Sequence, residues 1–194
     1  MNSTDTLKVI RERRERLMRY TNPRVRPFEM ERDAWVLWGA YDLGSFPAMP
    51  KGLKPAQFFE VVRSFRATKS QCLVVEEDHK YFREKRGPVA LVSIENFNDW
   101  RIEPQVDFFF WASKRQRLAA VVSFLQMVRY SREVGVCVVR VPDRDVPFCE
   151  HLYKYDLLRA CGKLPNASPL GMEHLFYVRG RKGEKKAEAV RRAA

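Results

Sequence analysis

The sequence predicts an α/β fold in which a mixed, mostly antiparallel sheet is flanked by helices. Residues 71–76 and 88–94 are two apolar runs joined by the charged segment 78–87, so we expect an antiparallel pair of strands. The stretch 105–142 reads as a strand, a basic turn, an amphipathic helix and a second strand without a long spacer. That order is a βαβ unit, which adds a parallel pair to the sheet.

Hydrophobic spacing and prolines define the elements of the first half. Ser3 to Asp5 can cap a first helix, and Asn22-Pro23 ends it because the residue before a proline disfavours helical geometry. This helix has few apolar positions, so we expect it to be helical only against a partner. In chain order the sequence predicts a helix at 6–20, a strand at 25–28, helices at 32–41 and 55–67, and strands at 71–76 and 88–94.

The second half begins with the aromatic run 105–111, which is typical of a buried strand. Ser113 is a candidate N-cap for a helix whose apolar residues recur at three- and four-residue steps, and Gly135 is expected to stop it. The predicted elements are a strand at 105–111, a helix at 118–132, a strand at 136–141, a helix at 146–162 and a strand at 173–179.

The composition is that of a folded protein with one sizeable core. The chain has 194 residues, of which 45% are hydrophobic and 12% aromatic. No apolar run reaches the roughly 18 residues of a membrane span, and no secretory signal is recognisable. We therefore expect a protein that is neither secreted nor transmembrane and has no membrane partner. The four cysteines lack CxxC spacing and the three histidines are scattered, so no metal site is expected.

The net charge of +12 is concentrated at the two ends. Residues 1–26 carry eight Lys or Arg against three acids, and residues 179–194 carry seven against two. We expect a basic N-terminal segment (1–23), a folded domain (24–179) and a basic tail (180–194). The basic ends either solubilise the chain or dock onto acidic protein or nucleic acid. The candidate partner-binding residues are Arg11, Arg13, Arg14, Arg16, Lys182, Lys185 and Lys186.

Over residues 24–179 the order of elements resembles the GNAT acyltransferase superfamily. The resemblance rests on the Arg26-Pro27-Phe28-Glu29 strand that leads into two helices, and on the strand, turn and helix that follow the antiparallel pair. It implies a central parallel strand pair that splays apart at its C-terminal ends. It also implies acetyl-CoA binding by the turn after the fourth strand.

The superfamily's turn has the pattern Arg or Gln, two residues, Gly, one residue, then Gly or Ala. In the best frame Arg115 and Ala120 match, whereas Leu118 stands where the glycine should be. A glycine there lets backbone N–H groups approach a pyrophosphate, and a branched side chain obstructs that approach. The candidate cofactor-binding residues are Ser113, Lys114, Arg115, Arg117, Leu118 and Ala120.

The resemblance also implies a catalytic tyrosine in the late helix and a carboxylate base near the central strands. Leu152 occupies the tyrosine position and Tyr153 lies one residue away, about 100° around a helix. A packing role for Tyr153 is the competing interpretation. The candidate bases are Glu95 and Asp107, with Glu103 behind them; a paired structural role competes with proton transfer for these carboxylates.

Two functions from different classes follow. The first is a GNAT-fold interaction or assembly protein that has an eroded site and needs no cofactor. Such a chain resembles the GNAT-like accessory proteins of tailed bacteriophages, some of which are carried in the virion. The resemblance implies partners within an assembly, and a location in the host cytoplasm or the virion. The alternative is an active N-acetyltransferase that uses acetyl-CoA.

Overall fold

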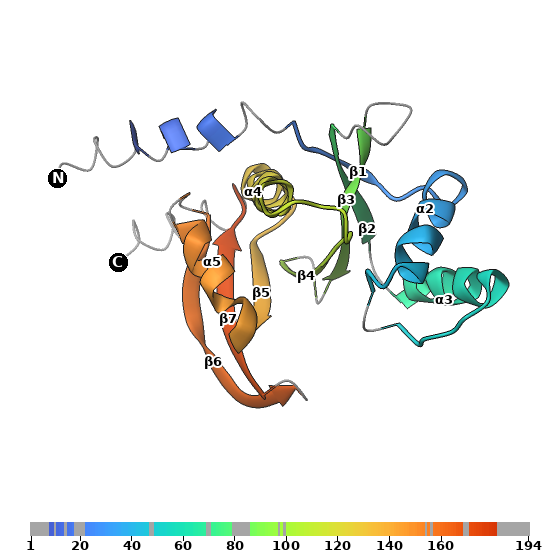
Figure 1. The fold of residues 1–194 in the computed structure, drawn as a ribbon. Helices are drawn as coiled ribbons and strands as arrows, with labels where there is room; N and C mark the ends of the chain where they lie inside the picture. Colours follow the sequence, from blue (N-terminus) through green and yellow to red (C-terminus); the bar gives the residue numbers. More distant parts are fainter. Residues whose placement is uncertain are drawn as a thin grey trace. The chain divides into compact units, whose positions relative to one another are not determined.

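The computed structural model confirms the predicted fold class. It describes residues 8–9, 11–13, 15–17, 22–46, 49–68, 71–78, 86–96, 98, 100–153, 155, 157–168 and 171–181. The elements in chain order are β1 (Arg24–Pro27), α2 (Met30–Asp42), α3 (Pro55–Thr68), β2 (Gln71–Asp78), β3 (Arg86–Asn96), β4 (Arg101–Phe108), α4 (Lys114–Tyr130), β5 (Val136–Pro142), a 3₁₀ turn (Asp143–Asp145), α5 (Val146–Tyr153), β6 (Arg159–Ser168) and β7 (Gly171–Arg179) (Figure 1).

The seven strands have the hydrogen-bonded order β1-β2-β3-β4-β5-β7-β6. The pairing of β4 with β5 is parallel, as the βαβ pattern predicted, and it joins Arg101 to Val136 and Ile102 to Cys137. The chain folds as two compact units. We call them the α2–α3 unit (21–95 and 105–120) and the β5–β7 unit (1–20, 96–104 and 121–194).

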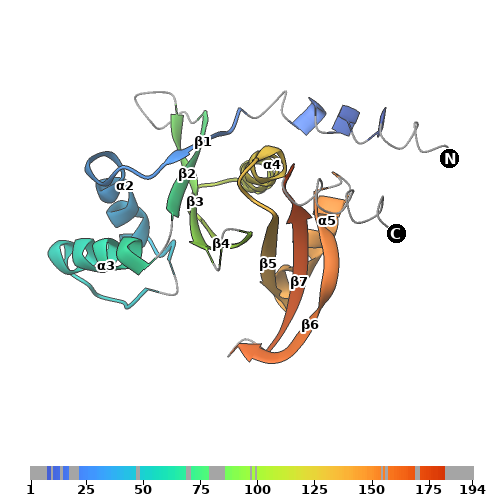
Figure 2. The same ribbon diagram turned by 180° about the vertical axis from the view of Figure 1, so that it is seen from behind.

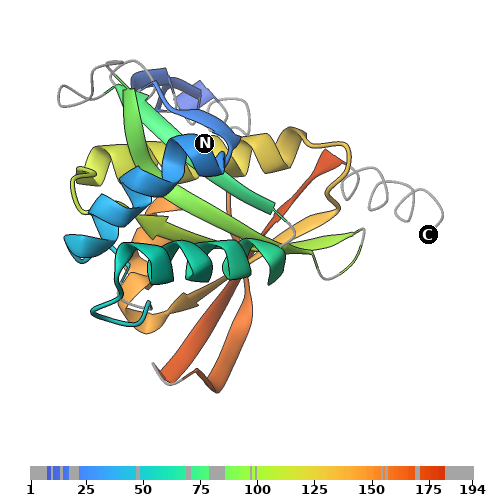
Figure 3. The same cartoon turned by 90° about the vertical axis from the view of Figure 1, so that its right-hand side faces the viewer.

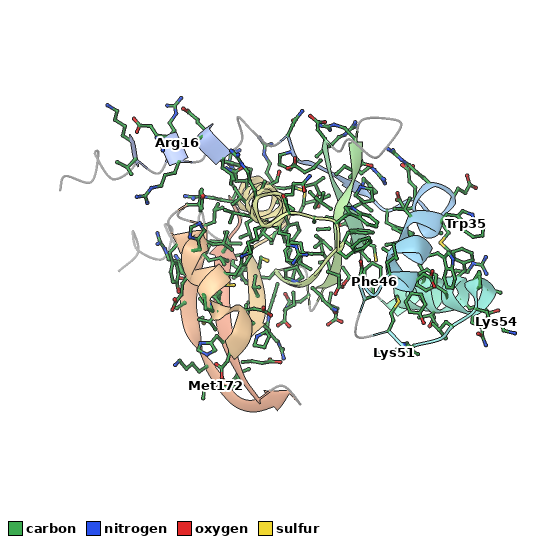
Figure 4. The ribbon with its side chains drawn as sticks, in the orientation of Figure 1. Arg16, Trp35, Phe46, Lys51, Lys54 and Met172 are labelled. Atoms are coloured by element: carbon green, nitrogen blue, oxygen red, sulfur yellow. The ribbon has the colours of Figure 1, made fainter. Side chains whose placement is uncertain are left out.

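In the α2–α3 unit, β2 pairs antiparallel with β1 on one side and with β3 on the other. The helices α2 and α3 lie in front of these strands in Figure 3. A cluster of buried apolar side chains joins the helices to the strands; its fully buried members include Ala40 and Phe58, both at 0% exposure. Trp35 of α2 is 64% exposed, and its ring makes a T-shaped contact with the ring of Phe59 (Figure 4).

In the β5–β7 unit, β7 lies between β5 and β6 and is antiparallel to both. Figure 2 shows these three strands in front of α5. The helix packs on them through Leu152, which is buried, and through Tyr153, whose ring centroid lies 6.0 Å from that of Phe176. Cys137 and Val141 of β5 are buried on the same sheet.

The predicted helix over 146–162 is wrong beyond Tyr153. The structure has a helix of eight residues, then the strand β6 at the end of the sheet. Apolar residues at 152, 155 and 158 have helical spacing, but Leu157 and Leu158 are both buried. These two residues belong to the connection that leads into β6, and both fill the core. Apolar spacing alone does not distinguish such a buried connection from a continuing helix.

Two boundaries also differ from the sequence prediction. The strand predicted at 105–111 is β4, which begins at Arg101 and gives way to a turn after Phe108. The helix α4 begins at Lys114 and ends at Tyr130, so Gly135 does not stop it. Gly135 instead lies against Trp100, because a Cβ at this position would be 2.3 Å from the indole ring. Close packing explains this glycine.

Candidate functional site

The turn that leads into α4 lies wholly within the α2–α3 unit, and its polar groups bond to one another. The Ser113 N–H donates to Gln116 Oε1 (3.0 Å), and the Gln116 N–H donates to Ser113 Oγ (3.3 Å). The Ser113 hydroxyl also donates to Gln116 Oε1 (2.9 Å). This reciprocal arrangement is a capping box, which satisfies two of the four N–H groups that a helix start leaves without a partner. Ser113 is therefore the N-cap that the sequence predicted.

Arg117 is held against the same turn. Its Nε donates to the carbonyl oxygen of Ala112 (2.9 Å), and its guanidinium carbon lies 5.6 Å from the centroid of the Phe108 ring. The cation–π contact and the hydrogen bond fix the guanidinium beside the end of β4. The guanidinium of Arg117 is thus engaged by the chain itself, through one hydrogen bond and one cation–π contact.

The remaining candidate residues of the turn have ordinary helix environments. Lys114 and Arg115 are exposed in the first turn of α4, and Leu118 is half-buried in the second. Ala120 is buried at 1% exposure, as is its neighbour Ala119 at 0%. The side chain of Leu118 therefore adds bulk where the superfamily's pattern has none.

The segment between β4 and α4 is also tied to its surroundings. The Phe109 N–H donates to the Val89 carbonyl (3.1 Å), and the Phe110 N–H donates to Ser45 Oγ (2.9 Å). Trp111 Nε1 donates to the Pro88 carbonyl (2.7 Å). These contacts hold the turn to β3 and to the loop after α2, so the backbone N–H groups that they use are not available to a ligand.

The candidate bases occupy different environments. Asp107 of β4 is half-buried, and burial raises its pKa, while a hydrogen bond from Gln105 Nε2 (3.3 Å) lowers it. Glu95 of β3 is also half-buried. Glu103 belongs to the β5–β7 unit, where it pairs with Arg101 and with Arg140 Nε (2.9 Å). Glu103 is thus a structural ion-pair partner in that unit.

Tyr153 packs within the β5–β7 unit. Burial raises the pKa of its hydroxyl, and a hydrogen bond with the Ala160 backbone partly offsets that effect. Its ring faces Phe176. The hydroxyl therefore has a partner on β6, which is the environment of a packing tyrosine.

The candidate partner-binding residues are described in part. Arg11, Arg13 and Arg16 are exposed on helical residues of the N-terminal segment, and Arg16 is labelled in Figure 4. Arg11 Nε pairs with Glu15 Oε1 (2.9 Å). Arg14, Lys182, Lys185 and Lys186 lie outside the described residues.

Leu17 of the same segment is buried at 7% exposure, and the described residues around it are helical in the single chain. The expectation of a helix only against a partner was therefore wrong. Among the apolar side chains described in this segment, Leu17 is buried by the chain itself and Val9 is exposed.

Sequence reasoning missed two groups of buried ionisable residues in the α2–α3 unit. Arg26 of β1 pairs with Asp33 of α2 and with Glu76 of β2, and all three are at most 8% exposed. Glu77, the next residue of β2, is 2% exposed and lacks an ionic partner of this kind among the described residues. The sequence predicted a strand at 71–76 and a charged segment from residue 78, and no local pattern distinguishes the buried acids among residues 76–78.

Two kinds of site are absent from the described residues. None of their helices is long and apolar enough to cross a membrane. In the same part of the chain no three His, Cys, Asp or Glu side chains gather where they could hold a metal ion.

Comparison with known proteins relates the chain to others through structure alone. No family profile and no curated protein matches the sequence. A chimera of the spermidine N-acetyltransferase SpeG of Vibrio cholerae aligns with a TM-score of 0.62 at 14% identity, over 84% of this chain and 98% of that one. A probable GNAT-family acetyltransferase of Chromobacterium violaceum aligns with a TM-score of 0.61 at 14% identity, over 84% of this chain and 85% of that one. The chain therefore has the GNAT fold.

Proposed function

We propose that this chain is a GNAT-fold interaction protein, of the kind that serves in an assembly, rather than an acetyltransferase. The observation that carries the proposal is the turn before α4. There the Ser113–Gln116 capping box uses two of the four backbone N–H groups that the start of this helix could offer to a pyrophosphate.

The other groups of the turn support the same function. Arg117 is engaged by Ala112 and Phe108, and Leu118 adds a branched side chain beside the helix start. A phosphate group would have to displace these contacts and lose the free energy that they contribute. The residues present therefore do not fit the phosphates of acetyl-CoA, and we derive no catalytic step through that cofactor.

The partner proposed here is another protein of an assembly. The support is the exposed charge of Arg11, Arg13 and Arg16 on a short helix, since arginine forks bind carboxylates and phosphates well. An acidic protein surface suits these side chains, and nucleic acid is the competing partner. A place in a bacteriophage virion rests only on the resemblance described above.

The direct test is calorimetric titration of the full chain with acetyl-CoA. We expect no binding in the low micromolar range for the natural sequence. The variant Leu118→Gly combined with Gln116→Ala, which frees the turn, should bind more tightly than the natural chain. Lys163→Ala, an exposed change on β6, is the control and should alter nothing. A dissociation constant near 1 μM for the natural chain, about −8 kcal/mol, would refute the proposal.

The second candidate function is acetyl transfer from acetyl-CoA to an amine. The likeness of the fold to N-acetyltransferases, among them SpeG, whose substrate is named as spermidine, favours it. Tyr153 would then be the candidate acid and Asp107 or Glu95 the candidate base. Release of free CoA thiol in the presence of spermidine distinguishes the two functions, because an interaction protein gives none above the rate of spontaneous hydrolysis.

A further inference from the structure

Glu77 is a buried carboxyl with incomplete hydrogen bonding, at the end of β2. It is 2% exposed, and its partner across the β2–β3 ladder is Gly87, which offers no side chain. One carboxyl oxygen, Oε1, is buried and has no hydrogen-bond partner among the described residues. Burying a charged oxygen without a partner is costly, so this carboxyl favours its neutral form.

The second oxygen joins Glu77 to the residue that leads into β1. The Asn22 N–H donates to Glu77 Oε2 (3.2 Å), and the Asn22 carbonyl accepts from Arg86 Nη2 (2.7 Å). Arg86 Nε in turn pairs with Asp78 Oδ1 (3.1 Å). The backbone N–H and the backbone carbonyl of Asn22 are thus both hydrogen-bonded, and the acceptor of the N–H is the titratable carboxyl of Glu77.

Charged groups from several elements face this carboxyl. Burial raises its pKa most, and the hydrogen bond from the Asn22 N–H lowers it, because a carboxylate accepts that bond more strongly than a neutral carboxyl does. Asp78 of the same strand raises the pKa further, whereas Arg86 of β3 and Arg115 of α4 lower it. From β1, Arg24 lies opposite Glu76, one residue along the ladder, and is exposed. Burial is the largest effect, and together these effects raise the pKa of Glu77 to about 7.

We propose that Glu77 is a proton-dependent latch for the start of β1: when it is neutral it stays buried and residues 22–24 stay closed, and when it is ionised it favours their opening so that its oxygens reach water. The opening stops before Arg26, because that side chain is fixed in its own buried ion pairs. It is a property of the single chain and does not depend on the interaction role proposed above.

Proton linkage fixes the pH range of the latch. Opening would expose Glu77 to water and return its pKa to the ordinary value of 4.5, whereas burial in the closed form raises its pKa to about 7. The closed form therefore binds the proton more tightly, and its stability is fully present below pH 4.5. Between pH 4.5 and 7 the opening equilibrium should rise about tenfold per pH unit, and above pH 7 it should level off.

Amide hydrogen exchange of the full chain, followed by NMR between pH 5 and pH 8, tests the latch. After correction for the intrinsic exchange rate, protection of the Asn22 amide should fall about tenfold per pH unit up to pH 7 and then stay constant. In Glu77→Gln the protection should vary less than about threefold over the whole range, because the group can no longer ionise. Glu60→Gln, an exposed change on α3, is the matched control and should keep the dependence.

Three outcomes would overturn the latch. The first is protection of the Asn22 amide that does not change with pH in the natural chain. The second is a fall in this protection in Glu77→Gln that equals the fall in the natural chain. The third is loss of the pH dependence in the control Glu60→Gln. A carbon-13 titration of the Glu77 carboxyl in the natural chain gives an independent reading that needs no variant. A midpoint near 7 supports the proposal, and a midpoint at the ordinary value refutes it.

Discussion

Arg26 should be among the most sensitive positions of the α2–α3 unit. Its guanidinium makes two bonds to Asp33, with Nη2–Oδ1 at 2.6 Å and Nη1–Oδ2 at 2.7 Å, and a third from Nε to Glu76 Oε1 at 2.8 Å. The hydrogen bond with Asp33 is the largest effect on the pKa of Arg26, which lies well above its ordinary value although burial opposes this. The structure therefore depends on the charged form of Arg26.

The perturbation is Arg26→Met, which keeps an unbranched chain and removes the charge. The carboxylates of Asp33 and Glu76, at 5% and 3% exposure, would then lose their buried cation. Removing one partner of a buried ion pair costs about 3–5 kcal/mol. For a chain of this size the melting temperature should fall by roughly 6–20 °C.

Arg32→Met is the matched control, because Arg32 Nη2 bonds the same Glu76 oxygen at 3.1 Å but its side chain is 43% exposed. Solvent screens such a pair, so the loss should be below about 1 kcal/mol. Urea unfolding followed by tryptophan fluorescence measures both variants. The reasoning is refuted if Arg26→Met loses less than about 1 kcal/mol, or if the two variants lose the same amount.

Two further predictions concern the β5–β7 unit. Gly135→Ala should lower the free energy of unfolding by about 1–3 kcal/mol, because the added Cβ would lie 2.3 Å from the Trp100 ring. Gly162→Ala is the control and should be nearly neutral, because a Cβ there would meet nothing within 4 Å. Equal unfolding midpoints for the two variants would count against the packing argument. Tyr153→Phe should cost about 1 kcal/mol through loss of the hydrogen bond with the Ala160 backbone. If this variant instead abolished a measurable acetyl transfer at unchanged stability, the tyrosine would be catalytic.

The sequence was sufficient for the elements whose pattern repeats over many residues. The antiparallel strands at 71–76 and 88–94 lie within β2 and β3, and the helices at 32–41 and 55–67 lie within α2 and α3. The pattern failed at β6, where the residues at 159–164 are exposed on an edge strand and carry no alternation of buried and exposed positions. Local periodicity does not predict β6, because this strand lies at the end of the sheet and pairs there with β7.

Burial of ionisable groups was equally hidden from the sequence. Glu76 and Glu77 are adjacent acids of one strand, so their side chains point to opposite faces of the sheet. Glu76 meets Arg26, which is 50 residues away in the chain, whereas Glu77 meets the Asn22 amide, 55 residues away. Only the tertiary fold decides that one acid is paired with a cation and the other is left with an orphan oxygen.

The candidate cofactor turn illustrates the same limit for function. From residue types, Ser113, Arg115 and Arg117 looked like anion ligands, and Leu118 was the single objection. In the structure the stronger objection comes from Gln116, which sequence reasoning passed over, because its amide oxygen accepts from both the backbone and the hydroxyl of Ser113. The spacing of a Ser and a Gln three residues apart is itself a capping signal. A basic turn at a helix start is thus evidence for an anion site only when no such side chain already satisfies the same amides.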